Sequence, residues 1–263
     1  IEKAQDELAL SQYIITAGCY PNEDGTAFYT KSAYMDECSL RSSMMRRTFT
    51  QAEKMKVVAD VAHALVVAHS AGVFHRAVSP DNIFFVPDGH AALANFYLAY
   101  LDAHSGKESY TVNSLLMKEF GSSPYMAPEV ADGDSIAASD IYSLGVVAYE
   151  MLVGKLPFDS PFVFHTRYGG DLPASQLPSA VVPDLPEWVD TLISRSVVED
   201  VDKRWASAQD MLDFIEDNMR PARAPAERVA DQRSVYVPAS HVISLKDLKP
   251  GDLVTNDLCL YEE

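Results

Sequence analysis

The sequence predicts an α+β fold in which a short strand-rich part precedes a larger helical part. Two strand-like runs, residues 13–19 and 27–33, flank a turn that contains Pro, Asn, Asp and Gly. Residues 50–72 carry apolar side chains at spacings of three and four, start with a capping box and end at a glycine. Residues 139–152 repeat the helical spacing. These patterns predict a small sheet followed by a helical core.

The elements before and after the first long helix are shorter. Residues 1–10 are typical of the end of a helix. Residues 73–86 are expected to form two short strands around a loop, and Asp88 and Gly89 form the next hairpin turn. The loop between these two strands therefore follows directly from the buried helix.

In the C-terminal third of the sequence, helical patterns are followed by a linker composition and then by a strand pattern. Residues 187–196 and 207–218 show helical spacing, and the second run starts with a Ser207/Asp210 cap. Residues 221–230 are rich in Ala, Pro and Arg, which is typical of a linker. Residues 234–263 alternate apolar and polar side chains, and this pattern predicts two or three further strands.

The charge of the chain limits the kinds of partner that it binds. The sequence has 21 basic and 38 acidic residues, a formal net charge of −17. Residues 219–263 carry six basic and seven acidic side chains, so nearly all of the negative charge belongs to the preceding residues. A surface this acidic repels polyanions, and we therefore expect neither nucleic acid nor direct membrane contact from this segment.

The cysteines indicate a reducing compartment. Cys19, Cys38 and Cys259 are odd in number and far apart, so they fit neither a disulfide framework nor a zinc site. No apolar run of about twenty residues occurs, and nothing is typical of a signal peptide. These features predict a cytoplasmic location.

Several motifs follow one another in a distinctive order. HRAVSPDNI occupies residues 75–83, ANFY residues 94–97, SSPYMAPEV residues 122–130 and DIYSLG residues 140–145. An arginine, Arg204, precedes the last helical run. Together they resemble the catalytic loop, the metal-binding turn, the end of the activation segment and the following helix of protein kinases, in a style closest to bacterial eukaryotic-like (Hanks-type) Ser/Thr kinases.

The resemblance covers residues 1–218 and implies a bilobal, protein-kinase-like fold. Residues 1–35 would form the back of a truncated N-lobe, with the end of one helix, two strands and the hinge. Residues 36–218 would form the helical C-lobe. Residues 219–263 would be a linker and a β-rich tail that either leads into another domain or adds a strand to the small lobe. The glycine-rich loop and the strand lysine of the family would precede residue 1.

The positions that carry out phosphoryl transfer in the family are changed. The catalytic-loop aspartate, which accepts the proton of the substrate hydroxyl, is replaced by Ala77. The lysine that steadies the transferred phosphoryl group is replaced by Ser79, and the aspartate that binds magnesium by Asn95. Asn82 is retained, and Tyr97 replaces the glycine of the metal-binding turn. The resemblance therefore implies no catalytic residue and no metal site.

The positions that support the catalytic loop in the family are retained. The resemblance implies that Asp140 accepts hydrogen bonds from the loop backbone, that Glu129 pairs with Arg204, and that Phe96 packs between the lobes. We assign structural roles to these residues and to two loop residues: His75, Arg76, Phe96, Glu129, Asp140 and Arg204.

A residual nucleotide pocket is also implied by the resemblance. Its lining would be Ser32 at the back of the pocket, Ala33 and Met35 in the hinge, and Phe84 under the adenine ring. Phe84 either fills part of this pocket or belongs to the core. We expect no required cofactor, and any ATP would bind weakly or without magnesium.

The predicted function is a pseudokinase, that is, a catalytically inactive scaffold or regulatory domain. Its partner would be another protein, with an adjacent kinase domain as one candidate. The alternative is a divergent Ser/Thr kinase or another nucleotide transferase that uses other acidic residues, for which Asp81, Asp88 and Asp102 are candidates. Hydroxyl groups within residues 98–120 form either an activation loop that phosphorylation orders against Arg76 or an ordinary polar loop.

Overall fold

The computed structural model describes residues 8–21, 28–32, 39–96, 123–131, 136–158 and 170–220. Contacts divide the chain into two units, Ile1–Pro221 and Ala222–Glu263, and all described residues belong to the first. The predicted strand-rich tail, the polar segment at 98–120 and most of the first predicted helix lie outside the described residues. Leu8 and Ala9, at the end of that helix, are helical.

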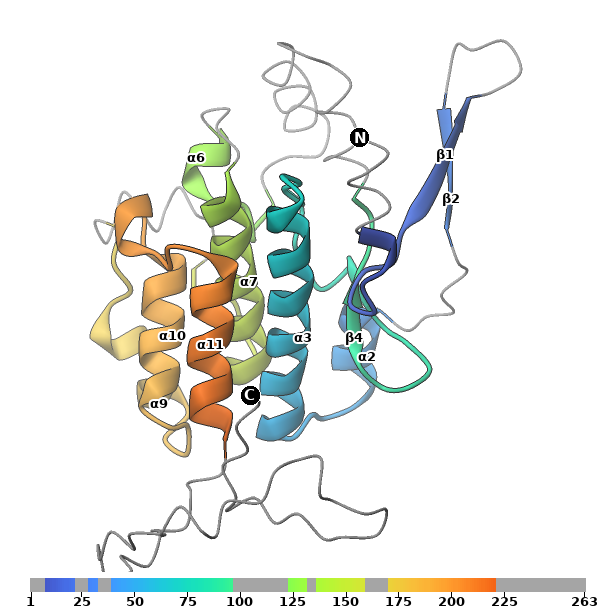
Figure 1. Ribbon diagram of the computed structural model, residues 1–263. Helices are drawn as coiled ribbons and strands as arrows, with labels where there is room; N and C mark the ends of the chain where they lie inside the picture. Colours follow the sequence, from blue (N-terminus) through green and yellow to red (C-terminus); the bar gives the residue numbers. More distant parts are fainter. Residues whose placement is uncertain are drawn as a thin grey trace, which may run out of the picture. The chain divides into compact units, whose positions relative to one another are not determined.

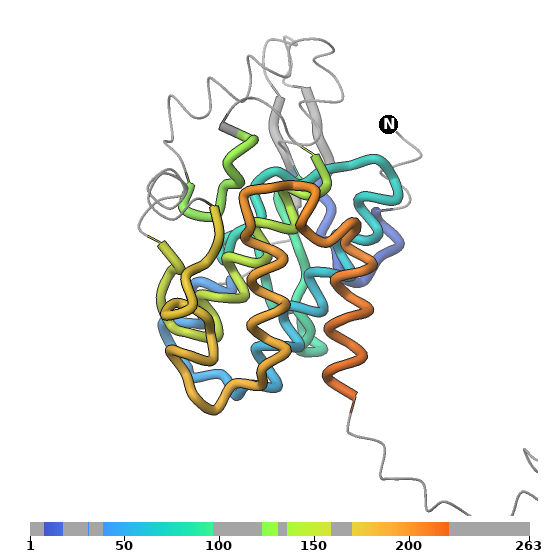
Figure 2. The backbone as a smooth tube through the Cα atoms, turned by 90° about the vertical axis from the view of Figure 1, so that its left-hand side faces the viewer, coloured from blue at the N-terminus to red at the C-terminus, as the bar shows by residue number. Residues whose placement is uncertain are grey.

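Four helices form the core of the first unit (Figures 1 and 2): α3 (Gln51–Ser70), α7 (Ala137–Val153), α10 (Trp188–Val197) and α11 (Ala208–Met219). α3 packs against α7 and α11, and α7 also packs against α10. All four lie within a few residues of the helices that the sequence predicts, so the helical part of the fold is confirmed.

The capping residues of α3 and α11 explain where these helices begin. The Thr50 side chain accepts a hydrogen bond from Glu53 N at 3.2 Å, and the Glu53 carboxylate accepts one from Thr50 N at 2.7 Å. Ser207 accepts a hydrogen bond from Asp210 N at 3.1 Å in the same way. Both predicted caps are confirmed, and each satisfies backbone N–H groups that have no partner within the helix.

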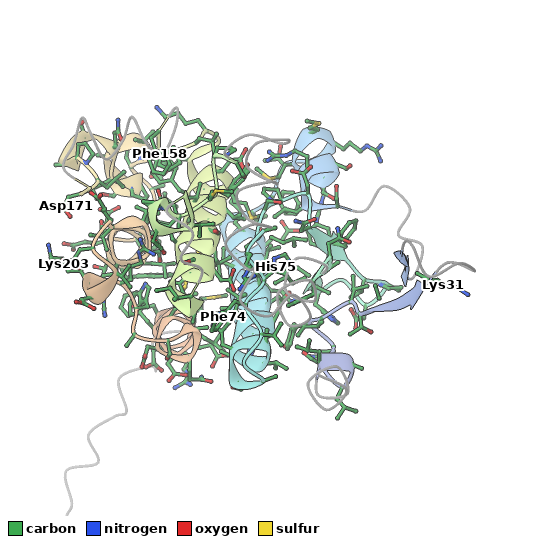
Figure 3. All side chains as sticks on the ribbon, turned by 90° about the horizontal axis from the view of Figure 1, so that it is seen from above. Lys31, Phe74, His75, Phe158, Asp171 and Lys203 are labelled. Atoms are coloured by element: carbon green, nitrogen blue, oxygen red, sulfur yellow. The ribbon has the colours of Figure 1, made fainter. Side chains whose placement is uncertain are left out.

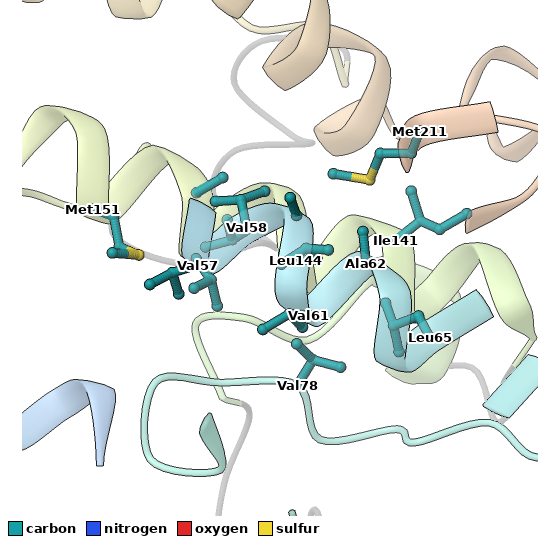
Figure 4. Close-up of a cluster of buried hydrophobic side chains, with 14 of the residues drawn as sticks. Val57, Val58, Val61, Ala62, Leu65, Val78, Ile141, Leu144, Met151 and Met211 are labelled. Atoms are coloured by element: carbon teal, nitrogen blue, oxygen red, sulfur yellow. The ribbon is translucent and has the colours of Figure 1, made fainter. Parts of the chain in front are cut away.

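Small and branched side chains allow α3 and α7 to pack closely (Figure 4). Val58, Val61, Ala62 and Leu65 are completely buried on α3, and Leu144 of α7 is completely buried in the same cluster. Burying a side chain of this kind contributes roughly 1.5–3 kcal/mol relative to leaving it exposed. The α3–α7 contact is therefore a main source of the stability of the first unit.

α7 and α10 approach each other most closely at a glycine. A Cβ atom added to Gly145 would lie 2.3 Å from Ser196 Cβ, which is closer than two carbon atoms can approach. Ser196 is completely buried and donates a hydrogen bond to Leu192 O at 2.7 Å. The spacing of these two helices therefore depends on the missing side chain.

Two small antiparallel sheets are present in the described residues. β1 (Ala17–Pro21) pairs with β2 (Phe28–Ser32), and β3 (Ile83–Phe85) pairs with β4 (Ala91–Leu93) around the predicted Asp88-Gly89 turn. The prediction that the first strand begins at residue 13 was wrong. Ile15 N donates to Leu93 O at 2.9 Å, so this part of the chain pairs with β4 before β1 begins.

The predicted strand before the loop was also wrong. Val73 N donates to Ala68 O at 2.9 Å, and His75 N donates to an Asp140 carboxylate oxygen at 2.7 Å. These backbone groups are used by the end of α3 and by a side chain of α7, so they are not available to a neighbouring strand.

Short helices that the sequence analysis did not predict complete the described residues: α2 (Leu40–Arg46), α6 (Pro128–Ala131), η2 (Ala174–Gln176), α9 (Pro178–Val181) and η3 (Val201–Lys203). Within the described ranges, none of the helices combines the length and the hydrophobicity that a membrane span requires.

Candidate functional site

The loop that follows α3 is organised around a buried histidine. His75 is completely buried, and Figure 3 shows it inside the group of helices, whereas Asp171 and Lys203 lie at the periphery. Its Nε2 lies 2.7 Å from Ala94 O, which only accepts, and its Nδ1 accepts a hydrogen bond from Ala77 N at 3.2 Å. The ring is therefore a neutral imidazole protonated on Nε2. The Phe96 ring packs edge-on against it, with centroids 4.6 Å apart.

Asp140 of α7 holds the backbone of this loop. Its carboxylate is fully buried and accepts hydrogen bonds from His75 N and Arg76 N, each at 2.7 Å, and from His69 Nε2 at 3.0 Å. Arg76 has φ +68°, a left-handed conformation that costs roughly 1–2 kcal/mol for a residue with a side chain. The two hydrogen bonds to Asp140 stabilise this strained residue.

The side-chain amides of Asn82 and Asn95 form a direct hydrogen bond. Asn82 Nδ2 donates to Ala77 O at 2.7 Å, and Asn95 Nδ2 donates to Asn82 Oδ1 at 2.9 Å. The carbonyl of Ala77 only accepts, so it fixes which end of the Asn82 amide is nitrogen, and Asn95 must then present its own nitrogen. Asn95 has φ +65°, and asparagine tolerates this left-handed conformation better than most residues do.

Glu129 of α6 forms an ion pair with Arg204. The two Nη atoms of Arg204 lie 2.6 and 3.0 Å from the two carboxylate oxygens of Glu129. The other N–H groups of Arg204 donate to the carbonyl oxygens of Ala138, Val198 and Glu199, so all five donors of the guanidinium are used. Burial disfavours the charged form of Glu129, but the bonds to Arg204 outweigh it and hold the pKa of Glu129 below its ordinary value of 4.5.

The loop held by Asp140, the Glu129–Arg204 ion pair and the helical core agree with the result of comparing the sequence with known families. The model of the protein kinase domain matches residues 5–214. The chain belongs to the protein kinase family.

Its relatives are bacterial serine/threonine kinases. Serine/threonine-protein kinase PknB of Mycobacterium tuberculosis is 31% identical over 233 residues, which cover 85% of this chain and 36% of PknB. PknL of the same organism is 35% identical over 156 residues, 58% of this chain and 37% of PknL. The probable kinase pknA2 of Bifidobacterium longum is 38% identical over 129 residues, 48% of this chain and 16% of pknA2. The chain thus spans only a minor part of the length of these relatives.

The amide pair does not fit the magnesium ion that kinases of this family use. Magnesium prefers anionic oxygen ligands in an octahedral arrangement. Asn82 Oδ1 already accepts an N–H from Asn95, and Asn95 presents a donor at the position where the resemblance to kinases implies a carboxylate. Among the described residues, no group of three or more His, Cys, Asp or Glu side chains is placed to hold a metal ion.

The predicted pocket is described only in part. Ala33 and Met35 lie outside the described residues, and Ser32 is described only as part of the β2 backbone. Phe84 is half-buried and is not packed against the core cluster, whereas its neighbours Ile83 and Phe85 are. Because alternate strand residues point to opposite faces, the Phe84 side chain lies on the side of β3 away from the core, so the interpretation of Phe84 as a core residue was wrong.

Two of the three acidic residues proposed for an alternative chemistry lie in the described part of the chain, and each is near a basic side chain. Asp81 is 64% exposed at its side chain, and its carboxylate lies 3.5 Å from Arg41 Nε. Asp88 lies in the β3–β4 turn, 2.5 Å from His90 Nδ1. Asp102 lies outside the described residues.

A polar network around Arg41 was missed by the sequence analysis. Arg41 Nη1 donates to Glu150 Oε1 at 2.8 Å, Arg41 Nη2 donates to the Tyr125 hydroxyl, and that hydroxyl donates to Glu150 Oε2 at 2.5 Å. Arg41 N also donates to Pro80 O at 3.0 Å. The network joins α2, the loop after α3, the residues just before α6, and also α7. Because the partners are far apart in sequence and α2 was not predicted, no local pattern indicated it.

His75 gives the protein a predicted pH dependence. Burial lowers the pKa of His75 below its ordinary value of 6.5, and the attraction of Asp140 only partly opposes this. The unfolded chain therefore takes up a proton before the folded chain does, and stability is lost as the pH falls below about 6.5. We expect the urea midpoint to decrease between neutral pH and about pH 5. The change of the urea midpoint with pH should be smaller in His75→Gln. An unchanged dependence on pH would contradict the role given to His75.

Proposed function

We propose that this chain is a protein kinase domain that does not transfer phosphate and acts as a regulatory or interaction module for another protein. The observation that carries the proposal is the Asn82–Asn95 hydrogen bond, which places an N–H group where phosphoryl transfer requires metal-binding oxygen. The position of the proton-accepting aspartate holds Ala77, whose methyl group accepts no proton. A pseudokinase of this kind keeps the kinase architecture without its chemistry.

The retained contacts support the same proposal. Asp140 still holds the loop backbone, and Glu129 still pairs with Arg204. Loss of function by random substitution would be expected to weaken buried contacts of this kind as well. Retention of the architecture together with replacement of Ala77, Ser79 and Asn95 is expected of a domain whose shape is still needed.

Transfer from labelled ATP tests the proposal. We expect no phosphate transfer to the chain itself or to a general protein substrate, with either magnesium or manganese present. The triple variant Ala77→Asp/Ser79→Lys/Asn95→Asp, in which the family residues are restored, is the matched comparison. Transfer by the natural chain above a protein-free blank would overturn the proposal. If that transfer survived in Asn82→Ala, the chemistry would also lie on other residues.

A single substitution tests the amide pair directly. In Asn95→Asp a carboxylate oxygen would face Asn82 Oδ1, so two acceptors would meet without a hydrogen between them. We expect the free energy of unfolding in metal-free buffer to decrease by about 1 kcal/mol. The decrease is small because the hydrogen bond is exposed. Magnesium should bridge the two oxygens and raise the Tm of this variant, measured by thermal shift.

The control for this experiment is Asn95→Ala, which removes the donor without adding a charge. Its Tm should not respond to magnesium, and neither should that of the natural chain. An equal response of all three proteins would contradict the role given to the amide pair.

A further inference from the structure

The short helix α2 buries little apolar surface. Leu40 is the only one of its seven residues that is buried, and the side chains at its end, Met45 and Arg46, are exposed. Figure 1 shows α2 outside the group formed by α3, α7, α10 and α11. Local stability depends on buried apolar contacts, so a helix of this kind opens more easily than the core helices do. Polar contacts therefore matter more for α2 than for the core.

Arg41 links α2 to three other parts of the chain. Its backbone N donates to Pro80 O in the loop after α3 at 3.0 Å, and its Nε lies 3.5 Å from a carboxylate oxygen of Asp81. Its two Nη atoms donate to Glu150 of α7 and to the Tyr125 hydroxyl. Burial disfavours the charged form of Arg41, but the bonds to Glu150 and Tyr125 outweigh it and hold the pKa above its ordinary value of 12.5. The guanidinium therefore stays charged.

The side chains of Arg41, Tyr125 and Glu150 form a closed set of contacts, because each of them bonds to the other two. The Tyr125 hydroxyl accepts from Arg41 and donates to one oxygen of Glu150, whose other oxygen accepts from Arg41. The side chain of Glu150 is 13% exposed, and Tyr125 is buried. Removal of any one of the three groups breaks two bonds in a largely buried site, so we expect these contacts to break together.

Tyr125 brings the residues just before α6 into the same set of contacts. Met126 N donates to Ser123 O at 3.0 Å, and Ala127 is buried, so residues 123–127 form one folded turn. The Glu129–Arg204 ion pair anchors α6 itself. The contacts of Tyr125 with α2 and α7 therefore hold the residues that precede α6.

We propose that α2 and residues 123–127 open and close as one cooperative unit, and that Arg41 couples them. Coupling of this kind is reciprocal, so a change that loosens one of the two elements loosens the other. The two elements lie far apart in the sequence, and Arg41 also bonds to the loop between them at Pro80. This conformational device goes beyond the interaction role proposed above, and it does not depend on whether the chain transfers phosphate.

Amide hydrogen exchange of the whole chain, followed by NMR, tests the coupling from both sides. The amide of Ser43, which donates to Ser39 O at 2.9 Å, reports on α2, and the amide of Met126 reports on residues 123–127. Tyr125→Phe removes only a hydroxyl group, and Arg41→Met removes the guanidinium. We expect each variant to speed exchange at both amides by at least about tenfold, while the amides of α10 and α11 keep their rates. Glu150→Gln should have the same effect.

The matched control is Arg47→Met. Arg47 directly follows α2, but its side chain contacts Glu53 and the rings of Phe49 and Phe85 instead of the Arg41 network. Its replacement should change the exchange of the Met126 amide by less than about twofold.

Two outcomes would overturn the proposal. If Tyr125→Phe left the exchange of the Ser43 amide unchanged, the two elements would open separately. If exchange rose equally in α2, residues 123–127 and α10, the substitutions would have lowered the stability of all of them, and no local unit would exist. Either outcome would leave the absence of phosphate transfer untouched, because the labelled-ATP experiment measures that independently.

Discussion

Replacing Asp140 by alanine is expected to lower the free energy of unfolding by about 3–5 kcal/mol, because three donors lose their shared buried acceptor. His75 N and Arg76 N would lose the carboxylate oxygens to which they donate. The left-handed conformation of Arg76 would also lose the contacts that stabilise it. Urea denaturation followed by circular dichroism measures the loss.

The control for this prediction is Asp213→Ala on α11. Asp213 is exposed and accepts a hydrogen bond only from Gln209 among the contacts described, so its loss should change stability by less than about 0.5 kcal/mol. Asp140→Asn is expected to fall between the two, because its amide keeps one acceptor oxygen and turns a donor toward a backbone N–H. A loss below about 1 kcal/mol in Asp140→Ala would show that the loop holds its shape without this carboxylate.

Replacing Arg204 by methionine is expected to cost a similar amount, about 3–5 kcal/mol, since Glu129 would remain as a largely buried charge without its partner. The carbonyl oxygens of Val198 and Glu199 would lose their donors as well. Arg204→Lys should recover little of the loss, because one ammonium group does not reach the same set of acceptors. Urea midpoints of these two variants give the comparison.

A double substitution separates the pair from its surroundings. Glu129→Gln/Arg204→Met removes both charges and should be more stable than Arg204→Met alone. If the stability lost in the double variant equalled the sum of the losses in Glu129→Gln and Arg204→Met, the two residues would not be coupled. This interpretation of the ion pair would then be wrong.

The same pair contributes to acid sensitivity. The pKa of Glu129 is lowered in the folded state, so its stabilising effect is present above the ordinary value of 4.5 and is lost as the pH falls below it. In Arg204→Met the acid slope of stability should decrease, because the glutamate no longer gains from being ionised. An unchanged slope would show that other carboxylates dominate acid unfolding.

Local patterns in the sequence predict the helical part of the fold well. α3 and α11 were expected because their caps and apolar spacing agree with each other, and α7 because its apolar residues recur at helical spacing. The position of β1 was predicted less well, because Ile15 pairs with Leu93, a residue far away in the sequence. α2 is only seven residues long and has little periodicity to detect.

The candidate site could be predicted as a set of positions but not as a set of contacts. The resemblance to kinases indicated that Asp140 would hold the loop and that Glu129 would meet Arg204, and both contacts are present. It did not indicate that Asn95 would donate to Asn82, because the sequence gives the residue types and not the orientation of the two amides. The Arg41 network joins residues more than eighty positions apart and depends on tertiary packing alone.

The close contact at Gly145 links the positions of α7 and α10. Because even one methyl group at this position would overlap Ser196, α7 and α10 are close-packed here, and close packing resists sliding of one helix along the other. We expect the two helices to move together, and Asp140 lies on α7 five residues before the glycine. A displacement of α10 is therefore expected to reach the Asp140 carboxylate, which accepts hydrogen bonds from the backbone of the histidine loop.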